Sequence, residues 1–467
     1  MKRGKAEIPK GAQDKTPRNT PEDMEVIQQN SPDPLKEEKI SLFPLLVVNF
    51  IGTLGLSIVL PFLVFLVNRL GGNAFVYGLA SSMYPTFQLI GAPILGRWSD
   101  IYGRKKILLL CQLGTLISWI IFLGALYLPL ITLFEVNSKT LGVFTFTLPL
   151  AILFFARAFD GLTGGDISIA NAYLADITSE KDRNRNFGKM SIALNLGFVV
   201  GPALAGILSV TQYGDAAPVL GAIVISFIGI LLLVFFIPES KQCSPKKSAD
   251  AENSQKLFGY DVKECETTTQ ETAKPAFGEI LKLPNIPYML GLNFLIDLSF
   301  NIFYTAFPLH AIKVLEWNLA QMSLYFTVLC SFLVFVQGPV LSWASKKYSD
   351  ATLIIFGSLM LGTNFLLLIS GNFFLTYLAT VFFALGDGLM TPSFLSLLSK
   401  IAGRRYQGTV QGFASSSGSL ASVFGLILGG LLYEVLNGSA FLIAGLVIYT
   451  AFLLNFRLRR FEKELRS

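Results

Sequence analysis

Three aspartates, Asp160, Asp297 and Asp387, lie within long stretches of apolar residues. Acids in apolar segments are costly to bury in the charged form, and they mark ion or substrate paths by default. Their chemistry is the uptake and release of a proton, which switches a buried charge off and on. Arg157 stands three residues before Asp160, so both lie on one helical face. Two interpretations stay open for this pair: a structural ion pair, or a proton or substrate site tuned by Arg157.

Asp297 is flanked by two amides, Asn293 and Asn301, each four residues away. This spacing places all three side chains on one face of a helix. Amides in a cavity can bind a substrate through hydrogen bonds, so we include further polar residues of the apolar segments. The expected proton and substrate pathway consists of Asn49, Gln88, Arg157, Asp160, Asn293, Asp297, Asn301, Asp387 and Gln411.

The segments that carry these residues are long enough to cross a membrane. Of the 467 residues, 52% are hydrophobic and 15% are charged, against roughly 25% charged in soluble domains. Eight runs contain no Lys, Arg, Asp or Glu and exceed the roughly 18 to 20 residues that a membrane helix needs. They are residues 40–68, 70–96, 107–134, 190–214, 216–238, 317–345, 406–433 and 435–456.

Four further spans contain polar interruptions or adjoin another span. They cover about residues 144–173, about residues 287–312, and two segments within residues 351–399 that Ser370, Gly371 and Asn372 divide by their turn chemistry. We therefore expect an all-α membrane protein with twelve transmembrane helices.

Polar segments divide the chain. Residues 1–39 hold eight Lys or Arg and no apolar core, so we expect a disordered tail, with the first span as its own insertion signal. Residues 239–279 form a polar linker between two six-helix bundles, 40–238 and 280–457, and residues 458–467 form a second tail.

Basic residues predict the orientation in the membrane. Thirteen Lys or Arg fall in the loops after spans two, four, eight and ten, and three fall in the loops on the other side. Because short cytoplasmic loops are rich in Lys and Arg, this puts both termini and the linker in the cytoplasm. The topology also accounts for the net charge of +6, and nothing indicates nucleic-acid binding.

The two bundles are related by an internal repeat. Residues 91–104 align without a gap to residues 337–350, so that Pro93 falls on Pro339. Asp160 likewise matches Asp387, residues 201–206 match residues 425–430, and Asn49 matches Asn293. Two pseudo-symmetric six-helix bundles are typical of secondary transporters, whose substrate site lies near mid-membrane where the halves meet.

A short motif, GRWSDIYGRKK at residues 96–106, resembles the signature between helices two and three of the major facilitator superfamily. The resemblance implies that Asp100 and Arg104 join a charge network with a neighbouring helix end, which helps to close the cytoplasmic side. Gly96 is expected where helices cross closely. The candidate gating residues are Gly96, Asp100, Gly103, Arg104 and Lys105.

A different interpretation of this loop is that its basic residues only satisfy the positive-inside rule. The repeat copy has lost the signature, because Lys346 stands in place of the acid and Asp350 in place of Arg104. We therefore expect any such lock to be one-sided.

Two more motifs resemble the same superfamily. RAFDG, residues 157–161, resembles its fourth-helix motif, and GFVVGPALAG, residues 197–206, resembles the fifth-helix signature of its antiporters and exporters. There Gly197, Gly201 and Gly206 would allow close packing and Pro202 would bend the helix. Packing alone would explain the glycines but not the Gly-Pro pair in this helix.

The region from Arg157 to Gly206 is similar to the tetracycline-resistance type of drug:proton antiporter. Those proteins carry an aspartate in helix one and another in helix three, and this chain has Gly52 and Ser118 there. Tetracycline is therefore not the expected substrate.

The leading expectation is a secondary active transporter that exports a small organic or amphipathic compound by proton antiport through alternating access. Two alternatives are a facilitative or proton-coupled importer of a sugar or metabolite, and a non-transporting receptor or regulator on the same fold. An enzyme is not expected, because no nucleophile–base pair, metal-ligand cluster or phosphate loop is present, so neither a cofactor nor a metal is implied.

The expected partners are a small-molecule substrate, protons and the lipid bilayer, and the protein is expected to be a monomer. We expect it in a bacterial inner (plasma) membrane with both termini in the cytoplasm. The single histidine, His310, is either a proton sensor or an interfacial side chain.

Overall fold

The computed structural model describes residues 42–178, 183–214, 216–239 and 285–464. The expected N-terminal tail and all but residue 239 of the expected linker lie outside these ranges. Side chains of residues 60, 183, 184, 403–409 and 464 are likewise outside the description.

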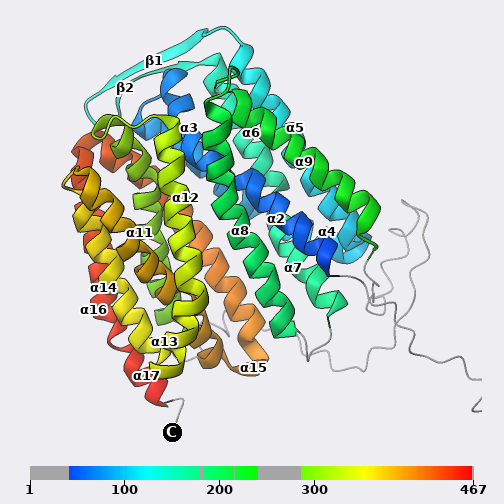
Figure 1. Cartoon of the computed structure of the whole chain (residues 1–467), viewed down its shortest axis with the longest axis vertical. Coiled ribbons are helices and arrows are strands. Elements are labelled where there is room, and N and C mark those ends of the chain that lie inside the picture. Colours follow the sequence, from blue (N-terminus) through cyan, green and yellow to red (C-terminus); the bar gives the residue numbers. More distant parts are fainter. Residues whose placement is uncertain (1–41, 179–182, 215, 240–284, 465–467) are drawn as a thin grey trace, which may run out of the picture. The chain divides into compact units, whose positions relative to one another are not determined.

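The part of the chain before the linker is helical with one hairpin (Figure 1). Its elements are α2 (Phe43–Ser57), α3 (Val59–Arg69), α4 (Ala74–Tyr102), α5 (Arg104–Tyr127), β1 (Thr132–Ser138), β2 (Gly142–Thr147), α6 (Leu148–Thr163), α7 (Asp166–Ile177), α8 (Arg183–Ser209) and α9 (Ala216–Phe236). We call this part the N-terminal half.

The part after the linker, the C-terminal half, consists of helices joined by short turns in its described residues. Its elements are α11 (Ile286–Lys313), α12 (Leu319–Phe335), η3 (Val336–Val340), α13 (Leu341–Lys347), α14 (Asp350–Leu368), α15 (Phe373–Leu436), η4 (Asn437–Ser439), α16 (Ala440–Asn455) and α17 (Leu458–Glu464). The last helix occupies most of the expected C-terminal tail.

Ten helical segments of the described residues are long and apolar enough to cross a membrane, which confirms a multi-pass helical membrane protein. One of them, Val410–Lys463, contains the end of α15 together with α16 and α17. Helix α4, with 29 residues, is not among the ten, because Gln88, Pro85, Pro93 and several Tyr, Ser and Gly residues along it lower its hydropathy.

Helix α15 has 64 residues, and a straight helix of that length would measure about 96 Å. Its two ends instead meet at one place. Cβ atoms added at Gly371, just before the helix, and at Gly438, just after it, would lie 3.9 Å and 3.3 Å from the ring of His310. The helix therefore reverses direction, and its residues make two passes through the half.

The β-hairpin was not expected from the sequence. Strands β1 and β2 pair antiparallel, with Glu135 opposite Thr145 and Val136 opposite Phe144. The predictions that the third span reaches residue 134 and that the fourth starts at residue 144 are therefore wrong, because α5 ends at Tyr127 and α6 begins at Leu148. Alternating β-branched and aromatic residues favour paired strands here.

The fourth span is also divided. It consists of α6 and α7, which are separated by Gly164 and Gly165. The first span likewise has two helices, α2 and α3, with Ile58 between them.

Helix α8 packs closely on α2. A Cβ added at Gly201 would stand 3.0 Å from the backbone oxygen of Leu54 and 3.0 Å from Cβ of Ser57. Gly197 lies beside the same helix, where Ser57 donates a hydrogen bond to its carbonyl oxygen at 2.9 Å. The glycines of this motif thus permit the expected close contact.

The C-terminal half repeats this packing. A Cβ added at Gly425 of α15 would stand 3.0 Å from the backbone oxygen of Leu298 and 2.6 Å from Cβ of Asn301, both on α11. In the sequence repeat, Gly425 matches Gly201 and these two residues match Leu54 and Ser57. Residues that match in the sequence repeat therefore make equivalent contacts in the two halves of the structure.

Glycines also join the two halves, in two related contacts. Gly206 of α8 faces α12, and a Cβ added at Gly206 would lie 2.7 Å from Cβ of Ser323. Gly430, which matches Gly206 in the repeat, faces Gly78 of α4. Near the second contact, Glu434 accepts a hydrogen bond from the backbone N–H of Ala74 at 3.1 Å.

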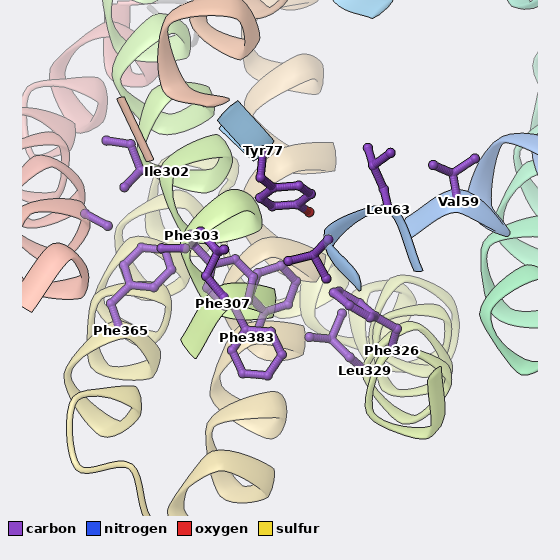
Figure 2. Close-up of a cluster of buried hydrophobic side chains, with 14 of the residues drawn as sticks. Val59, Leu63, Tyr77, Ile302, Phe303, Phe307, Phe326, Leu329, Phe365 and Phe383 are labelled. Carbon is purple, nitrogen blue, oxygen red and sulfur yellow. The ribbon is translucent and has the colours of Figure 1, made fainter. Parts of the chain in front are cut away.

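Both contacts between the halves lie near those helix ends that are on the same side of the protein as the β1–β2 hairpin. Gly71, just before α4, accepts a hydrogen bond from the Thr145 backbone of β2 at 2.9 Å. The largest buried apolar cluster also crosses between the halves, since Val59, Leu63 and Tyr77 pack with side chains of α11 and α12 such as Phe307 and Phe326 (Figure 2).

A Gly78→Ala substitution tests the contact between α4 and α15. The added Cβ would lie 2.6 Å from the Leu426 backbone oxygen, so the two helices must separate, at a cost of about 1–3 kcal/mol. We expect a lower Tm for the purified protein in detergent. Gly124→Ala is the control, because no other part of the described structure comes within 4 Å of its Cβ position, and equal Tm values for the two variants would contradict the close contact.

Candidate functional site

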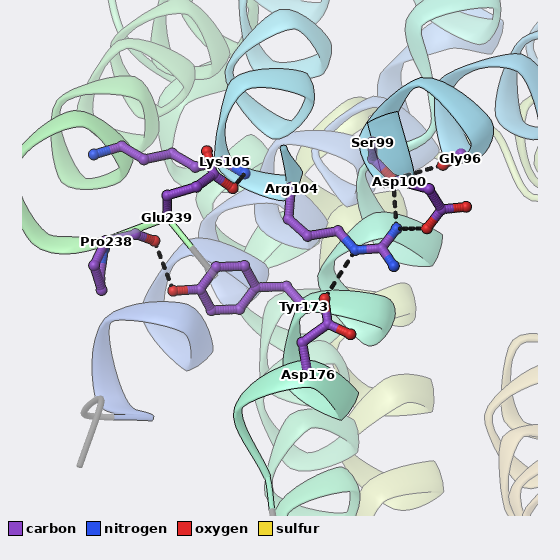
Figure 3. A network of polar contacts seen from close by, with 9 residues as sticks. All are labelled: Gly96, Ser99, Asp100, Arg104, Lys105, Tyr173, Asp176, Pro238 and Glu239. Carbon is purple, nitrogen blue, oxygen red and sulfur yellow. Dashed lines mark hydrogen bonds and ion pairs between the residues drawn. The ribbon is translucent and has the colours of Figure 1, made fainter. Parts of the chain in front are cut away.

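The first candidate site is a charge network at the end of α4 away from the hairpin (Figure 3). The Arg104 guanidinium pairs with Asp100 Oδ1 at 2.6 Å and with Asp176 Oδ2 at 3.0 Å. It also donates a hydrogen bond to Ser99 Oγ at 2.7 Å. Asp176 lies in the last turn of α7, so the expected network with a neighbouring helix end is formed, within the N-terminal half.

The turn between α4 and α5 contacts Glu239, which lies shortly after the end of α9. Gly103 has φ +109°, and the carboxylate of Glu239 lies 2.7 Å from where its Cβ would stand. The same carboxylate accepts a hydrogen bond from the Lys105 backbone N–H at 3.0 Å, and Tyr173 donates to the Pro238 carbonyl at 2.8 Å. An anion at this position also complements the positive N-terminal end of α5.

The repeat keeps a counterpart of this network with the charges reversed. Asp350, which matches Arg104, begins α14 and pairs with Lys400 of α15. Ser396 donates a second hydrogen bond to the same carboxylate at 3.0 Å. The second half therefore also ties the corresponding helix end, through an acid where the first half uses a base; that any lock is one-sided stays a prediction.

Gly96 does not have the role expected for it. Apart from its own helix, no atom of the described residues lies within 4 Å of where its Cβ would stand, so no described helix crosses closely at this residue. Its place in the gating set depends on the family resemblance alone.

The second candidate site is a buried pair in the N-terminal half. Arg157 and Asp160 on α6 are 8% and 7% exposed, and their side chains approach to 3.5 Å. Thr115 of α5 donates a hydrogen bond to Asp160 Oδ1 at 3.0 Å, and the Arg157 guanidinium stacks 5.1 Å from the centre of the Tyr84 ring. The spacing of three residues thus places the two charges together as an ion pair, and both interpretations of the pair, structural or functional, stay open.

Asp160 also borders a pocket, which we call the N-half pocket. It has about 480 Å³ of empty space, part of it open to solvent. It lies among helices of the N-terminal half only. Its lining consists of Ile51, Gly52, Thr53, Leu56, Tyr84, Gln112, Thr115, Trp119, Asp160, Asp166, Ile167 and Ser226.

The break between α6 and α7 lies beside this pocket. The carbonyl oxygen of Gly164 in the break accepts a hydrogen bond from Gln88 Nε2 at 2.9 Å, and Gln88 also bonds to the Tyr84 hydroxyl at 3.1 Å. Backbone groups that a helix break leaves unpaired inside a membrane must find such partners. Gln88 therefore supports the break that leads into the pocket.

The third candidate site is in the C-terminal half. Asn293 Nδ2 donates to Asp297 Oδ2 at 2.8 Å, and Asn301 Nδ2 donates to the Asp297 backbone oxygen at 2.7 Å. Thr391 donates to Asp387 Oδ1 at 2.8 Å. The two aspartates are near enough to interact electrostatically, so the fold brings together acids that are far apart in the sequence.

Two other expected pathway residues lie apart from these clusters. Asn49 is 7% exposed, and its Nδ2 has no hydrogen-bond partner among the described residues. Gln411 is exposed on α15. His310, in the last turn of α11, is 2% exposed and contacts the rings of Tyr433 and Phe441, so protein side chains enclose it.

Sequence reasoning missed one acid. Asp166 opens α7 and lines the N-half pocket with Asp160. Two signals could have identified it: it is an acid at membrane depth, and it follows two glycines, which favour the end of one helix and the start of another. Among the described residues, no group of three or more His, Cys, Asp or Glu could hold a metal ion.

The fold and these sites define a helical membrane transporter. A sequence model of the Major Facilitator Superfamily matches residues 45–423 and again residues 289–467. The chain belongs to this superfamily.

Its curated relatives include drug-resistance proteins. It is 26% identical over 420 residues to the class E tetracycline resistance protein of Escherichia coli, covering 88% of this chain and 93% of that protein. It is 25% identical over 417 residues to multidrug resistance protein 2 of Bacillus subtilis, with 88% and 93% covered.

Solved structures share the fold. A D-xylose–proton symporter superposes with a TM-score of 0.68 at 14% identity, covering 89% of this chain and 97% of that one. The human organic anion transporter MFSD10 superposes with a TM-score of 0.59 at 18% identity, with 91% and 100% covered.

Two glycines of one motif give a matched test of the α4–α5 turn. Gly103→Ala puts a side chain at φ +109° and against the Glu239 carboxylate, at a cost of about 1–3 kcal/mol. Gly96→Ala has open space and gains up to about 1 kcal/mol of helix propensity. We expect thermal unfolding to show a lower Tm for the first variant and an unchanged or higher Tm for the second; the reverse order would refute the assigned roles.

Proposed function

We propose that this protein exports a small organic or amphipathic compound in exchange for protons, by alternating access. The observation that carries the proposal is the placement of acids: each half holds such a cluster, with Asp160 buried and Asp297 and Asp387 half-buried, and Asp160 and Asp387 correspond in the repeat. The names of the relatives, tetracycline and multidrug resistance proteins, support export as the direction.

The proposed arrangement is twelve transmembrane helices in two six-helix bundles. The ten apolar segments support this count once α4 is added and Val410–Lys463 is divided between α15 and α16. The Lys and Arg distribution supports cytoplasmic termini. A monomer in a bacterial plasma membrane completes the proposal.

Protons drive the cycle through neutralisation of buried charge. Protonation of Asp160, Asp297 or Asp387 would remove a negative charge from the protein interior and change the balance between inward-open and outward-open states. The membrane potential contributes roughly 2.3 kcal/mol per charge for each 100 mV. Arg157 holds Asp160 in place and offers it a partner when it is ionised.

The substrate is proposed to be organic and other than tetracycline. Gly52 and Ser118 stand where the tetracycline exporters carry aspartates. The amides and aromatic rings near the acids, such as Asn293 and Tyr84, offer hydrogen bonds and stacking surfaces to an amphipathic compound.

Purified protein in proteoliposomes tests this proposal. With an imposed pH gradient, a substrate found by screening a deletion strain should move against its own gradient, and an internal pH dye should report proton movement. Asp160→Asn, Asp297→Asn and Asp387→Asn should each reduce this driven flux by about tenfold or more, a loss of about 1.4 kcal/mol. Glu135→Gln, which removes an exposed carboxylate of the hairpin, should keep it.

Two results would count against the proposal. Substrate uptake that follows only its own gradient and ignores the pH gradient would favour facilitated import. Unchanged function in all three aspartate variants would favour a receptor or regulator that does not transport.

A further inference from the structure

Helix α17 lies at the side of the C-terminal half opposite the hairpin (Figure 1). It follows α16 after a turn at Phe456 and Arg457, so it begins directly where the last apolar helix ends. Leu458 and Phe461 on one face of α17 are buried. An amphipathic helix next to a membrane helix lies at the boundary between the lipid chains and the aqueous phase.

Two contacts attach α17 to other helix ends of the same half. Glu462 accepts a hydrogen bond from the backbone N–H of Ala351, in the first turn of α14, at 3.3 Å. Tyr288, in the first turn of α11, packs edge-to-face on Phe461, and the Arg457 guanidinium lies over both rings. The Glu462 carboxylate is therefore directed at α14 and not at the surroundings of the protein.

The outer face of α17 is basic. Arg459 and Lys463 are exposed, and their spacing of four residues puts them on one face of the helix. No ion pair among the described residues includes either of them. Two cationic groups therefore share one face, and the described part of the chain supplies no anion to them.

An apolar surface leads to these charges. Leu446 and Leu453 of α16, and Phe456 just after it, are exposed, and their spacing of seven and three residues places them along one side of the helix. Exposed apolar surface of this kind on a membrane helix is a lipid contact. The Arg459 guanidinium lies 5.6 Å from the centre of the Phe456 ring, at the end of this surface.

The combination matches the shape and charge of an anionic phospholipid. Its acyl chain would lie along the leucines, and its phosphate would meet the Arg459 guanidinium, which can bind phosphate oxygens with two parallel hydrogen bonds. In the proposed orientation α17 lies at the cytoplasmic leaflet, whose surface is negatively charged. The positive-inside rule explains basic residues at such a helix end, but it does not require an arginine that stacks where a lipid-facing surface ends.

We propose that α17 and the end of α16 bind an anionic phospholipid from the bilayer. Arg459 and Lys463 hold its phosphate, and Leu446, Leu453 and Phe456 contact its acyl chain. The bound lipid keeps α17 against the first turns of α11 and α14 and so stabilises the C-terminal half. This lipid site goes beyond the proposed export of an organic compound and does not depend on it.

The full-length protein in detergent tests the lipid site. Dioleoyl phosphatidylglycerol is titrated into it, and dioleoyl phosphatidylcholine, with the same chains and no net charge, is titrated in parallel. Because a ligand of the folded state raises Tm by mass action, phosphatidylglycerol should raise Tm at a lower concentration than phosphatidylcholine. Added NaCl should reduce this difference by screening. Sodium phosphate without lipid, at constant ionic strength, should not reproduce the rise.

Variants of the basic face separate its charge from its packing. Arg459→Gln and Lys463→Gln should each raise the half-saturating concentration of phosphatidylglycerol about fivefold, which corresponds to about 1 kcal/mol. Arg459→Lys keeps the charge and should lose less. The matched control is Lys139→Gln, which removes one exposed positive charge next to the hairpin and should leave the titration unchanged.

A preference for phosphatidylglycerol that falls in Arg459→Gln and Lys463→Gln but survives in Lys139→Gln supports the lipid site. Equal titrations with the two lipids, an unchanged preference in Arg459→Gln, or a rise of the same size with phosphate alone overturns it. Since lipid binding is measured without transport, a negative result here leaves the proposed export standing, and absence of proton-driven flux leaves the lipid site standing.

Discussion

The membrane interior penalises every charge and every unpaired backbone group, and this constraint accounts for most of the polar structure of the protein. The cost of burying the Arg157 charge is reduced because Arg157 pairs with Asp160 and stacks on the Tyr84 ring. The break between α6 and α7 is acceptable because Gln88 bonds to the exposed carbonyl of Gly164. Polar groups that remain unmatched after these pairings, such as the Trp119 N–H, are those that a ligand can satisfy.

Close backbone approach is the second basis of the fold. Without a hydrophobic force between membrane helices, packing depends on small residues. The same glycine contacts occur within each half, between α8 and α2 and between α15 and α11, and they occur again between the halves. The surface between the halves therefore includes backbone and small residues at both contacts.

Local spacing predicted those features of the sites that depend on one helix. A separation of three residues gave the Arg157–Asp160 pair, and a separation of four gave the hydrogen bond from Asn293 to Asp297. The repeat predicted which helices correspond, because matched glycines select matched partners. Hydropathy predicted the membrane spans, although their ends were uncertain wherever an apolar strand such as β1 continued an apolar helix.

Features that depend on two distant segments could not be predicted. Gly96 belongs to a motif in which glycine suggests a helix crossing, yet whether a partner is present depends on how α4 lies among its neighbours. The Asp166 carboxylate lies beside Gly52 of α2. A glycine gives no signal in the sequence about which group occupies the space where a side chain would stand. Glu239 likewise contacts Gly103 only because the chain after α9 returns to the α4–α5 turn.

The reversed polarity of the two helix-end pairs bears on how a duplicated chain assembles correctly. Arg104 pairs with Asp176, whereas Asp350 pairs with Lys400. Were a helix to dock on its counterpart in the wrong bundle, Arg104 would meet Lys400 and Asp350 would meet Asp176, and both encounters are repulsive. Two similar sequences joined in one polypeptide are thereby discouraged from exchanging partners while they insert and fold.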